Sequence, residues 1–221
     1  MPGAKAVPKE AKILTGIAVI VIIGGVLLFL KGNPQPDAPS QPVDSASLVR
    51  EGSHMTGTKD AKVTVVEFGD YQCPYCASIN PAVAQLIKNY RGNSNVNVVF
   101  RNFPLSQHIN SQVAAEAAEA AGAQGKFWDM HDKIYEKQAD WENSNSALDI
   151  FVGYANELGL DVTKFRQDVG SNKFAEIIKA DLDDGVKLGV DATPTFFING
   201  QKQAFIANFD ELDTKVSAAL K

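Results

Sequence analysis

The hydrophobic positions along the chain follow three patterns: a long continuous run, a short β-branched run and a spacing of three or four residues. An uncharged apolar run covers residues 13–30. A short β-branched run at 63–68 stops at Gly69, which is typical of a strand buried on both faces. From about 110 to 189, apolar residues instead recur every three or four positions, the spacing of amphipathic helices. These patterns predict an apolar N-terminal segment, a buried strand and a long helical region.

The remaining apolar runs predict the elements that complete one sheet. A helix is expected from residue 74 to about 90, and a second strand at 95–101 should return parallel to the first in a βαβ unit. Near the C-terminus two β-rich runs flank Asn199 and Gly200, the dipeptide most typical of a two-residue hairpin. A last amphipathic helix closes the chain. The helical region then becomes an insertion, at about 108–189, between two parts of one sheet.

The apolar run at 13–30 predicts a membrane-inserted segment. Its eighteen residues would span about 27 Å as a helix, close to the hydrocarbon core of a bilayer. Three lysines precede the run and one closely follows it, so by the positive-inside bias residues 1–12 are expected in the cytoplasm and the rest outside. Residues 29–34 lack the small side chains of a signal-peptidase site. An uncleaved transmembrane anchor is therefore favoured over a cleaved signal peptide.

A proline-rich stretch follows the apolar run. Residues 31–60 contain four prolines and few large apolar side chains, which predicts an extended linker. The letters GSHM at 52–55 are interpreted as part of it. The folded domain is therefore expected at 61–221.

The charge of the chain excludes one class of partner. It has 26 acidic and 21 basic residues, a formal net charge of −5, and four of the lysines lie in the first 31 residues. The domain beyond them is therefore more acidic still, with no basic patch to neutralise phosphates. Nucleic acid is not expected as a partner.

The only two cysteines, Cys73 and Cys76, come directly after the buried strand in the sequence EFGDYQCPYC. A zinc site needs about four ligands, and the three histidines are scattered over the chain, so no metal is expected. A purely structural disulfide across so short a loop would restrict the unfolded chain very little. A redox-active dithiol is the interpretation that the position favours.

The position of this dithiol at the start of a helix favours the ionised form of its first cysteine. Unpaired backbone N–H groups and the positive end of the helix dipole favour a thiolate at Cys73. Pro74 suits the first helical position, where its missing N–H costs nothing. Three-residue spacing brings Cys76 beside Cys73, at a separation that a disulfide accepts. We therefore expect Cys73 to be the exposed nucleophile and Cys76 the deeper, resolving cysteine, with no cofactor.

With these residues the chain resembles the thioredoxin superfamily, and within it the DsbA-like thiol-disulfide oxidoreductases. The resemblance covers about residues 58–221 and rests on four segments in order: EFGDYQCPYC, FRNFPL, GKFWDMHDKIY and VDATPTFFING. It implies a thioredoxin-like α/β fold with a helical insertion, preceded here by the transmembrane helix and the linker.

The resemblance also implies a substrate-binding site. The bond before Pro194 is expected to be cis, with the proline against the reactive sulfur and the backbone of Thr193 free to pair with an extended peptide. Pro74 and Tyr75, between the cysteines, are expected to contact the same substrate. The alternative for Pro194 is an ordinary proline at the start of a strand.

Glu67 interrupts the apolar strand six residues before Cys73. If its carboxyl faces the interior, burial raises its pKa and penalises its charged form. Members of the superfamily often have an acidic residue here that exchanges a proton with the deeper cysteine, and the resemblance implies that role for Glu67. A glutamate turned to solvent at the strand end is the alternative.

Other residues near these segments are expected to be structural. Asp70 and Tyr71 should shape the turn before the helix, and Trp128 and His131 should pack on one helix. Residues 205–208 lack the glycine-containing turn that the resemblance leads one to expect, so this part of the groove is not predicted.

Together these features predict a membrane-anchored, extracytoplasmic thiol-disulfide oxidoreductase that oxidises thiols of secreted or envelope proteins. A tether suits electron transfer to a quinone-linked membrane partner, as the resemblance implies. A disulfide reductase in the same compartment is the nearest alternative, because the dipeptide between the cysteines does not fix the direction. A non-catalytic, peptide-binding thioredoxin-like module is the other alternative.

Overall fold

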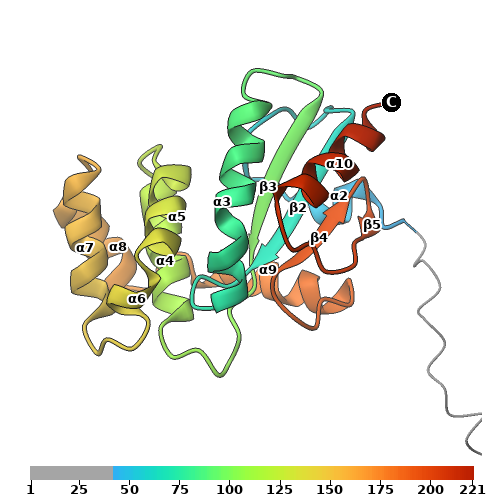
Figure 1. Cartoon of the computed structure of the whole chain (residues 1–221). Helices are drawn as coiled ribbons and strands as arrows, with labels where there is room; N and C mark the ends of the chain where they lie inside the picture. Colours follow the sequence, from blue (N-terminus) through green and yellow to red (C-terminus); the bar gives the residue numbers. More distant parts are fainter. Residues whose placement is uncertain (1–41) are drawn as a thin grey trace, which may run out of the picture. The chain divides into compact units, whose positions relative to one another are not determined.

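A five-stranded sheet organises residues 42–221, the part of the chain that the computed structural model describes (Figure 1). Its strands, in the spatial order β1-β3-β2-β4-β5, are β1 (His54–Met55), β2 (Val63–Gly69), β3 (Val96–Asn102), β4 (Thr195–Ile198) and β5 (Gln201–Lys202). β2 pairs in parallel with β3 and antiparallel with β4. The β-branched run is therefore a central strand, as its pattern predicted.

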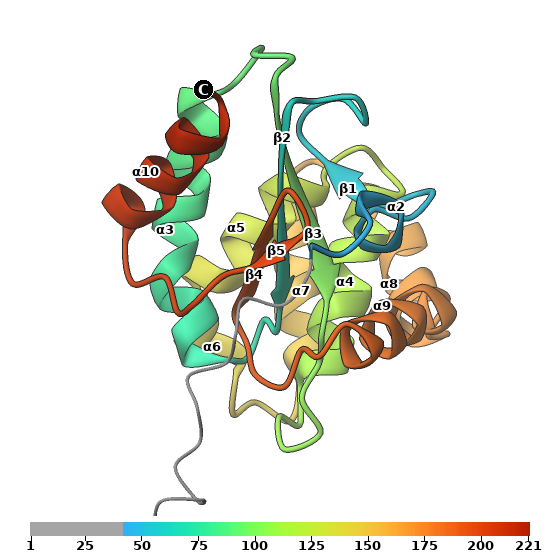
Figure 2. The ribbon, with the colours of Figure 1, turned by 90° about the vertical axis from the view of Figure 1, so that its right-hand side faces the viewer.

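Helices cover both faces of the sheet. Figure 2 shows α3 (Pro74–Asn89) and α10 (Phe209–Ala219) together on one side of it, with α9 (Ala175–Lys187) on the other. Val65 packs in the cluster formed with α3 and α10, whereas Phe68 packs on the opposite face with Leu48 of α2 (Ser45–Leu48). Since side chains alternate along a strand, Glu67 points to the same side as Val65, toward α3.

The long helical region between β3 and β4 is confirmed as an insertion between two parts of one sheet. Besides α9 it contains α4 (Ser111–Gly122), α5 (Phe127–Glu136), α6 (Gln138–Trp141), α7 (Ala147–Glu157) and α8 (Val162–Gly170). α4 lies at its centre and contacts α5, α7 and α8. Most of the alanines of α4 are fully buried, and their small side chains let three helices pack around one.

The hairpin predicted at Asn199 and Gly200 is present between β4 and β5. Both residues have positive φ, 47° and 82°, which is the conformation of the two central positions of a type I′ turn. The second strand of the hairpin is shorter than its apolar pattern suggested. β5 covers only Gln201–Lys202, and Phe205 lies exposed beyond it.

The linker expected at 31–60 ends earlier than predicted, because residues 43–57 pack on the domain. The backbone N–H of Val43 donates to the Gly200 carbonyl at 2.8 Å. Leu48 is buried in the core cluster beneath the sheet. β1, which contains two of the GSHM letters, pairs antiparallel with β3 and extends the sheet. Composition did not reveal this, since each partner lies far away in the sequence.

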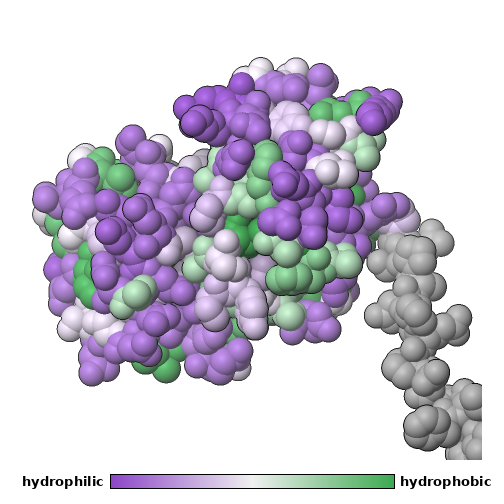
Figure 3. All heavy atoms as spheres, viewed as in Figure 1, coloured by the Kyte–Doolittle hydropathy of each residue, from purple (hydrophilic) through white to green (hydrophobic). Residues whose placement is uncertain are grey.

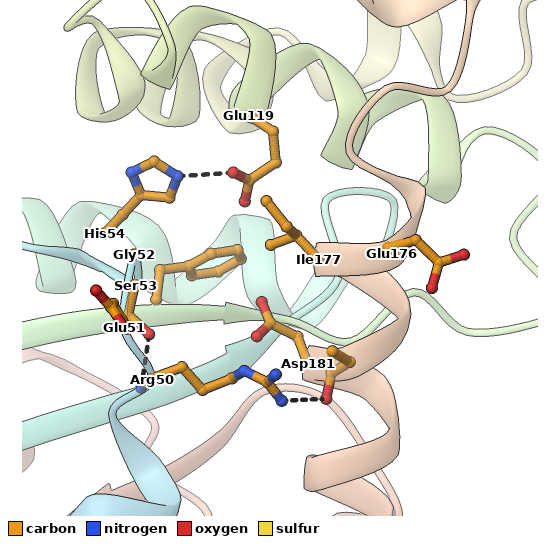
Figure 4. Close-up of a pocket in the computed structure, with 11 residues that line it drawn as sticks. Arg50, Glu51, Gly52, Ser53, His54, Glu119, Glu176, Ile177 and Asp181 are labelled. Atoms are coloured by element: carbon orange, nitrogen blue, oxygen red, sulfur yellow. Dashed lines mark hydrogen bonds and ion pairs between the residues drawn. The ribbon is translucent and has the colours of Figure 1, made fainter.

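Polar contacts of His54 and Arg50 fix this N-terminal segment to the insertion (Figure 4). The His54 ring stacks on Phe127, with centroids 3.6 Å apart, and its Nε2 lies 2.8 Å from the Glu119 carboxylate. Arg50 donates from its guanidinium to the Ala180 carbonyl of α9 at 3.4 Å. The same segment lines a cavity together with α4 and α9.

A buried guanidinium joins the strands to α9. Arg101 of β3 has no exposed surface, and its Nε donates to Asp181 at 2.6 Å. A second nitrogen bonds Asp184 at 2.9 Å, and a third donates to the Leu48 carbonyl at 2.8 Å. All three partners come from elements outside the strand, so this one side chain fixes α2 and α9 against the sheet.

The transmembrane segment expected at 13–30 and the first part of the linker lie outside the described residues. Within 42–221, no helix is both long and apolar enough to cross a membrane.

Truncation of Leu48 should test whether the N-terminal segment belongs to the domain. Leu48→Ala removes a buried side chain, and the resulting cavity should lower the free energy of unfolding by about 2–5 kcal/mol, measured by urea denaturation. Val186→Ala, at a side chain that is 62% exposed, is the control and should change it by less than about 0.5 kcal/mol. Equal effects of the two substitutions would show that residues 43–57 do not contribute to the core.

Candidate active site

Both cysteines lie at the N-terminal end of α3, where the chain leaves the central strand. Cys73 is the N-cap residue and Pro74 the first helical residue, as their order in the sequence predicted. The two thiols are free. Cys76 is completely buried, but only 4% of Cys73 is exposed. The expectation of an exposed nucleophile is therefore corrected: Cys73 reaches solvent through a small opening only.

The segment that covers Cys73 comes from the start of β4. The Thr193–Pro194 bond is cis, and the Cys73 thiol donates to the Thr193 carbonyl at 3.3 Å. Two segments that lie 120 residues apart thus meet at the reactive sulfur. The register that pairs Phe68 of β2 with Thr195 of β4 brings the two strand ends together.

The surroundings of Cys73 favour its thiolate. Its pKa is lowered to about 5, first by a hydrogen bond from the Cys76 thiol, while its partial burial opposes the shift. The backbone N–H groups of Tyr75 and Cys76 lower it further. The neighbouring thiol thus contributes more than any single backbone group of the helix end.

Cys76 has the opposite character. Burial raises the pKa of its thiol well above the ordinary value, and its hydrogen bond to Cys73 and the nearby Glu67 charge act in the same direction. Its sulfur accepts only a long hydrogen bond, 3.5 Å, from the backbone N–H of Asp70. At neutral pH the pair therefore holds one thiolate, on Cys73, and one protonated thiol.

Glu67 is inside the protein and not turned to solvent. Its side chain is 2% exposed and faces α3 from the centre of the sheet. Burial raises its pKa to about 8, and the Cys73 thiolate adds to the shift. The carboxyl therefore holds a proton at neutral pH, near a thiol that must lose or gain one.

Asp70 has a larger role in the turn than the sequence suggested. Its carboxylate accepts hydrogen bonds from the Gln72 N–H at 2.8 Å and the Leu105 N–H at 2.9 Å. His108 Nδ1 lies 2.6 Å away, and the Ser111 hydroxyl also donates to it. One buried carboxylate thus binds the turn before Cys73 to the loop after β3. No sequence signal marks His108 or Ser111, because both are distant along the chain.

His131 is a packing residue, as expected. It is fully buried, and burial lowers its pKa to about 3, so the ring is neutral. Nε2 lies 3.1 Å from the Asn80 amide oxygen, which can only accept, so Nδ1 accepts from the Tyr71 hydroxyl at 3.0 Å. The ring therefore joins α5 to α3 beneath the turn.

Two aromatic side chains are exposed beside the dithiol. Tyr75 is 63% and Phe205 67% exposed, and their rings meet edge to face with centroids 6.4 Å apart. Figure 3 shows apolar residues gathered over the N-terminal part of α3 and the segment between β5 and α10. Phe205, which the resemblance did not predict, therefore adds apolar surface next to the reactive sulfur.

Among residues 42–221, no group of three or more His, Cys, Asp or Glu side chains is placed to hold a metal ion.

The fold and this site define a class of protein: a thioredoxin-like domain with a C-x-x-C dithiol at a helix start and a cis-proline segment against its first sulfur. A family model described as Thioredoxin matches residues 50–218. The chain belongs to this family.

Solved structures narrow the class. The oxidised crystal structure of BdbD from Bacillus subtilis has a TM-score of 0.70 and 28% identity, covering 84% of this chain and 99% of that one. A thioredoxin-like oxidoreductase from Silicibacter pomeroyi has a TM-score of 0.65 and 29% identity, covering 80% and 98%. The thiol-disulfide exchange protein α-DsbA2 from Wolbachia pipientis, 22% identical with a TM-score of 0.67 over 79% and 90%, shares the fold. The resemblance of this chain to the DsbA-like thiol-disulfide oxidoreductases is confirmed.

Curated relatives are much longer proteins. A Na(+)/H(+) antiporter NhaA 1 of Salinispora arenicola is 40% identical over 167 residues, which is 75% of this chain and 24% of that protein. The NhaA of Herminiimonas arsenicoxydans is 36% identical over 152 residues, 69% of this chain and 23% of that protein. The chain thus spans about a quarter of the length of the curated relatives it matches.

The difference in acidity between the Cys73 and Cys76 thiols should appear in their rates of alkylation by iodoacetamide. The rate at Cys73 should be half-maximal near pH 5, because only the thiolate reacts and its pKa is about 5. Peptide mapping by mass spectrometry should find Cys76 unmodified over the same range, since its thiol stays protonated. A midpoint near 8.5, the ordinary thiol value, or modification of Cys76 first, would contradict the assignment.

Replacement of Glu67 by Gln should reveal its raised pKa in the stability of the reduced protein. The folded carboxyl keeps its proton up to about pH 8, whereas the unfolded one loses it near pH 4.5, so folding takes up a proton in this window. The wild type should therefore lose stability as pH rises from 4.5 to 8, and Glu67→Gln should not share this loss. Urea unfolding at pH 4.5 and 8.5 measures the free energy of unfolding of both proteins. If the two proteins differ by the same free energy at both pH values, the pKa of Glu67 is not raised.

Proposed function

We propose that this chain catalyses thiol-disulfide exchange with proteins outside the cytoplasm, chiefly as an oxidant of their thiols. The observation that carries the proposal is the unequal acidity of the two cysteines. Cys73, with a pKa of about 5, is a good leaving group and a stable thiolate, whereas Cys76 is protonated. A disulfide whose reduced form is stabilised in this way accepts electrons readily, so the equilibrium favours oxidation of the substrate.

The first exchange joins the substrate to Cys73. A substrate thiolate attacks the Cys73 sulfur of the Cys73–Cys76 disulfide, a mixed disulfide forms, and Cys76 leaves as a thiolate. The Glu67 carboxyl, protonated at neutral pH, supplies the proton that converts Cys76 to its thiol. Because Cys76 is fully buried, this proton needs a donor inside the protein.

The second exchange releases the product. A second substrate thiolate attacks the substrate sulfur of the mixed disulfide, and Cys73 leaves as its stabilised thiolate. Two electrons have then passed from the two substrate thiols to the dithiol. The low pKa of Cys73 speeds this step, because a more acidic thiol is the better leaving group.

The neighbouring residues suit an extended, apolar peptide. The Thr193 backbone, beside the reactive sulfur, supplies main-chain partners, and Pro194 follows it in the cover over Cys73. Pro74 begins the helix next to this cover. Tyr75 and Phe205 present exposed rings at the same opening. Unfolded chains expose apolar side chains near their cysteines, which fits substrates that have not yet completed folding.

Localisation and reoxidation complete the proposal. An anchor at 13–30, with the N-terminus in the cytoplasm, would hold the domain at the outer surface of the membrane. Each turnover leaves the dithiol reduced, so an acceptor of two electrons is required, and a quinone-linked membrane protein within reach of the tether fits that need. Both statements rest on the charge and apolar pattern of the N-terminal residues and on the family resemblance.

Removal of the resolving cysteine should trap the exchange intermediate. With Cys76→Ala and Cys73 first converted to its mixed disulfide with 5-thio-2-nitrobenzoate, the thiolate of a reduced substrate protein with a single cysteine should displace that group and remain joined to Cys73, visible as a covalent adduct on a non-reducing gel and lost with dithiothreitol. The control, Cys73→Ala, should give no adduct. If neither protein forms adducts with any reduced secreted protein, the exchange mechanism is wrong, and a peptide-binding module becomes the better description.

The reduction potential of the Cys73–Cys76 pair decides whether the protein oxidises or reduces its substrates. Residues 42–221 equilibrated with glutathione should give a value near about −120 mV, that of the strong oxidant DsbA, because the Cys73 thiolate stabilises the reduced form. A value near about −270 mV, that of thioredoxin, would assign the protein as a reductase.

A further inference from the structure

One buried phenol near the dithiol has no role in the mechanism above. Tyr135 lies in the last turn of α5 and is only 3% exposed. Its hydroxyl is buried and has no hydrogen-bond partner within residues 42–221. A buried hydroxyl without a partner is costly, and a phenylalanine would fill the same space without that cost. A tyrosine at this position therefore suggests that its hydroxyl gains a hydrogen-bond partner in another state of the protein.

The position of this hydroxyl is defined by the end of β2. A Cβ atom built on Gly69 would lie 3.0 Å from the Tyr135 oxygen. Gly69 is two residues after Glu67 on the same face of the strand, and the next residue, Asp70, donates its N–H to the Cys76 sulfur. The phenol, the carboxyl and the deeper sulfur thus converge at one strand end.

The ring of Tyr135 is held in this orientation. Its centroid lies 4.8 Å from that of Tyr71 and 5.0 Å from that of His131, both of which are buried. His131 is itself fixed by its hydrogen bond to Tyr71. With neighbours on two sides, the hydroxyl stays directed into the interior.

The phenol keeps its proton under all working conditions. Burial raises its pKa well above 10, and the nearby charges of Cys76 and Glu67 raise it further. It can therefore give a hydrogen bond to a negative charge but cannot act as an acid itself. Negative charge appears here once in every turnover, when Cys76 leaves and the proton of Glu67 moves to it.

We propose that Tyr135 is a positioning residue that stabilises this transient charge. Its hydroxyl donates a hydrogen bond to the anion shared by Cys76 and Glu67, first as thiolate and then, after the proton moves, as carboxylate. No bond of the phenol breaks, and its proton returns unchanged. The inference rests on the proposed thiol-disulfide exchange and adds to it a third member of the buried proton-transfer group.

The test measures resolution of a mixed disulfide by Cys76 alone. The reduced protein is joined at Cys73 to 5-thio-2-nitrobenzoate by one equivalent of the corresponding disulfide, and the coloured thiolate is released when Cys76 attacks. This attack requires the Cys76 proton to pass to the ionised fraction of Glu67, which grows as the pH approaches about 8, so it samples the same anion. Tyr135→Phe should slow the release about tenfold at pH 7 and move its pH midpoint up by about one unit, since a hydrogen bond to a charge is lost.

Tyr154→Phe is the matched control. The Tyr154 hydroxyl is also buried without a partner within 42–221, but it lies on α7, and the charges that raise its pKa belong to Asp140 and Glu157. This variant should release the coloured thiolate at the wild-type rate. Equal slowing in both variants, or a wild-type rate and pH profile in Tyr135→Phe, would overturn the inference.

Two further measurements separate positioning from damage to the fold. Alkylation of Cys73 should be unchanged in Tyr135→Phe, and the melting temperature of the reduced variant should be equal to or above that of the wild type, because an unpaired hydroxyl is removed. Slower alkylation or a lower melting temperature would assign Tyr135 a structural role instead. The assay does not depend on whether the protein oxidises or reduces its substrates. A reduction potential near that of thioredoxin would contradict the oxidant proposal but not the role of Tyr135. A wild type that releases no coloured thiolate would contradict the proposed thiol-disulfide exchange itself.

Discussion

The packing of the Thr193–Pro194 segment against the Cys73 sulfur, which lies 3.3 Å from the Thr193 carbonyl oxygen, is the contact around which the rest of the site is built. It requires the end of β2 and the start of β4 to lie side by side, which their antiparallel register provides. It also leaves the reactive sulfur almost covered, so acidity rather than exposure makes it reactive. The neighbouring Cys76 thiol stabilises the anion on Cys73, and burial in turn keeps Cys76 protonated. The hydrogen bond between the two sulfurs and the deeper burial of Cys76 thus separate a nucleophile from a resolving thiol.

The helical insertion holds the turn before Cys73 in place through hydrogen bonds from two of its helices. The Asp70 carboxylate binds the turn before Cys73 to the start of α4 through Ser111. The neutral ring of His131 joins Tyr71 of the same turn to α3. Both groups are buried, where a hydrogen bond that loses its partner is costly, so the turn has little freedom to move. The helical block is therefore a structural part of the active site as well as a separate layer of helices.

The difference between prediction and structure is greatest at residues 43–57. Their glycines and small polar residues are typical of a linker, yet Leu48 is a core residue and His54 stacks on Phe127. A short strand with two residues has no periodicity to detect, and the groups that hold it, on β3, α4 and α5, are contributed by distant parts of the chain. Packing of this kind depends on surfaces that exist only after the rest has folded.

The sequence by itself determined the elements and the chemistry. A β-branched run that ends at a C-x-x-C pair with proline at the first helical position specifies a buried strand, a helix and a dithiol at its start, because period, turn residues and capping act locally. Only the tertiary structure decided that Glu67 faces inward with a raised pKa, that Thr193 covers Cys73, and that Phe205 and Tyr135 lie beside the dithiol. Acidity, burial and proximity depend on atoms that are distant in sequence and meet only in the folded chain.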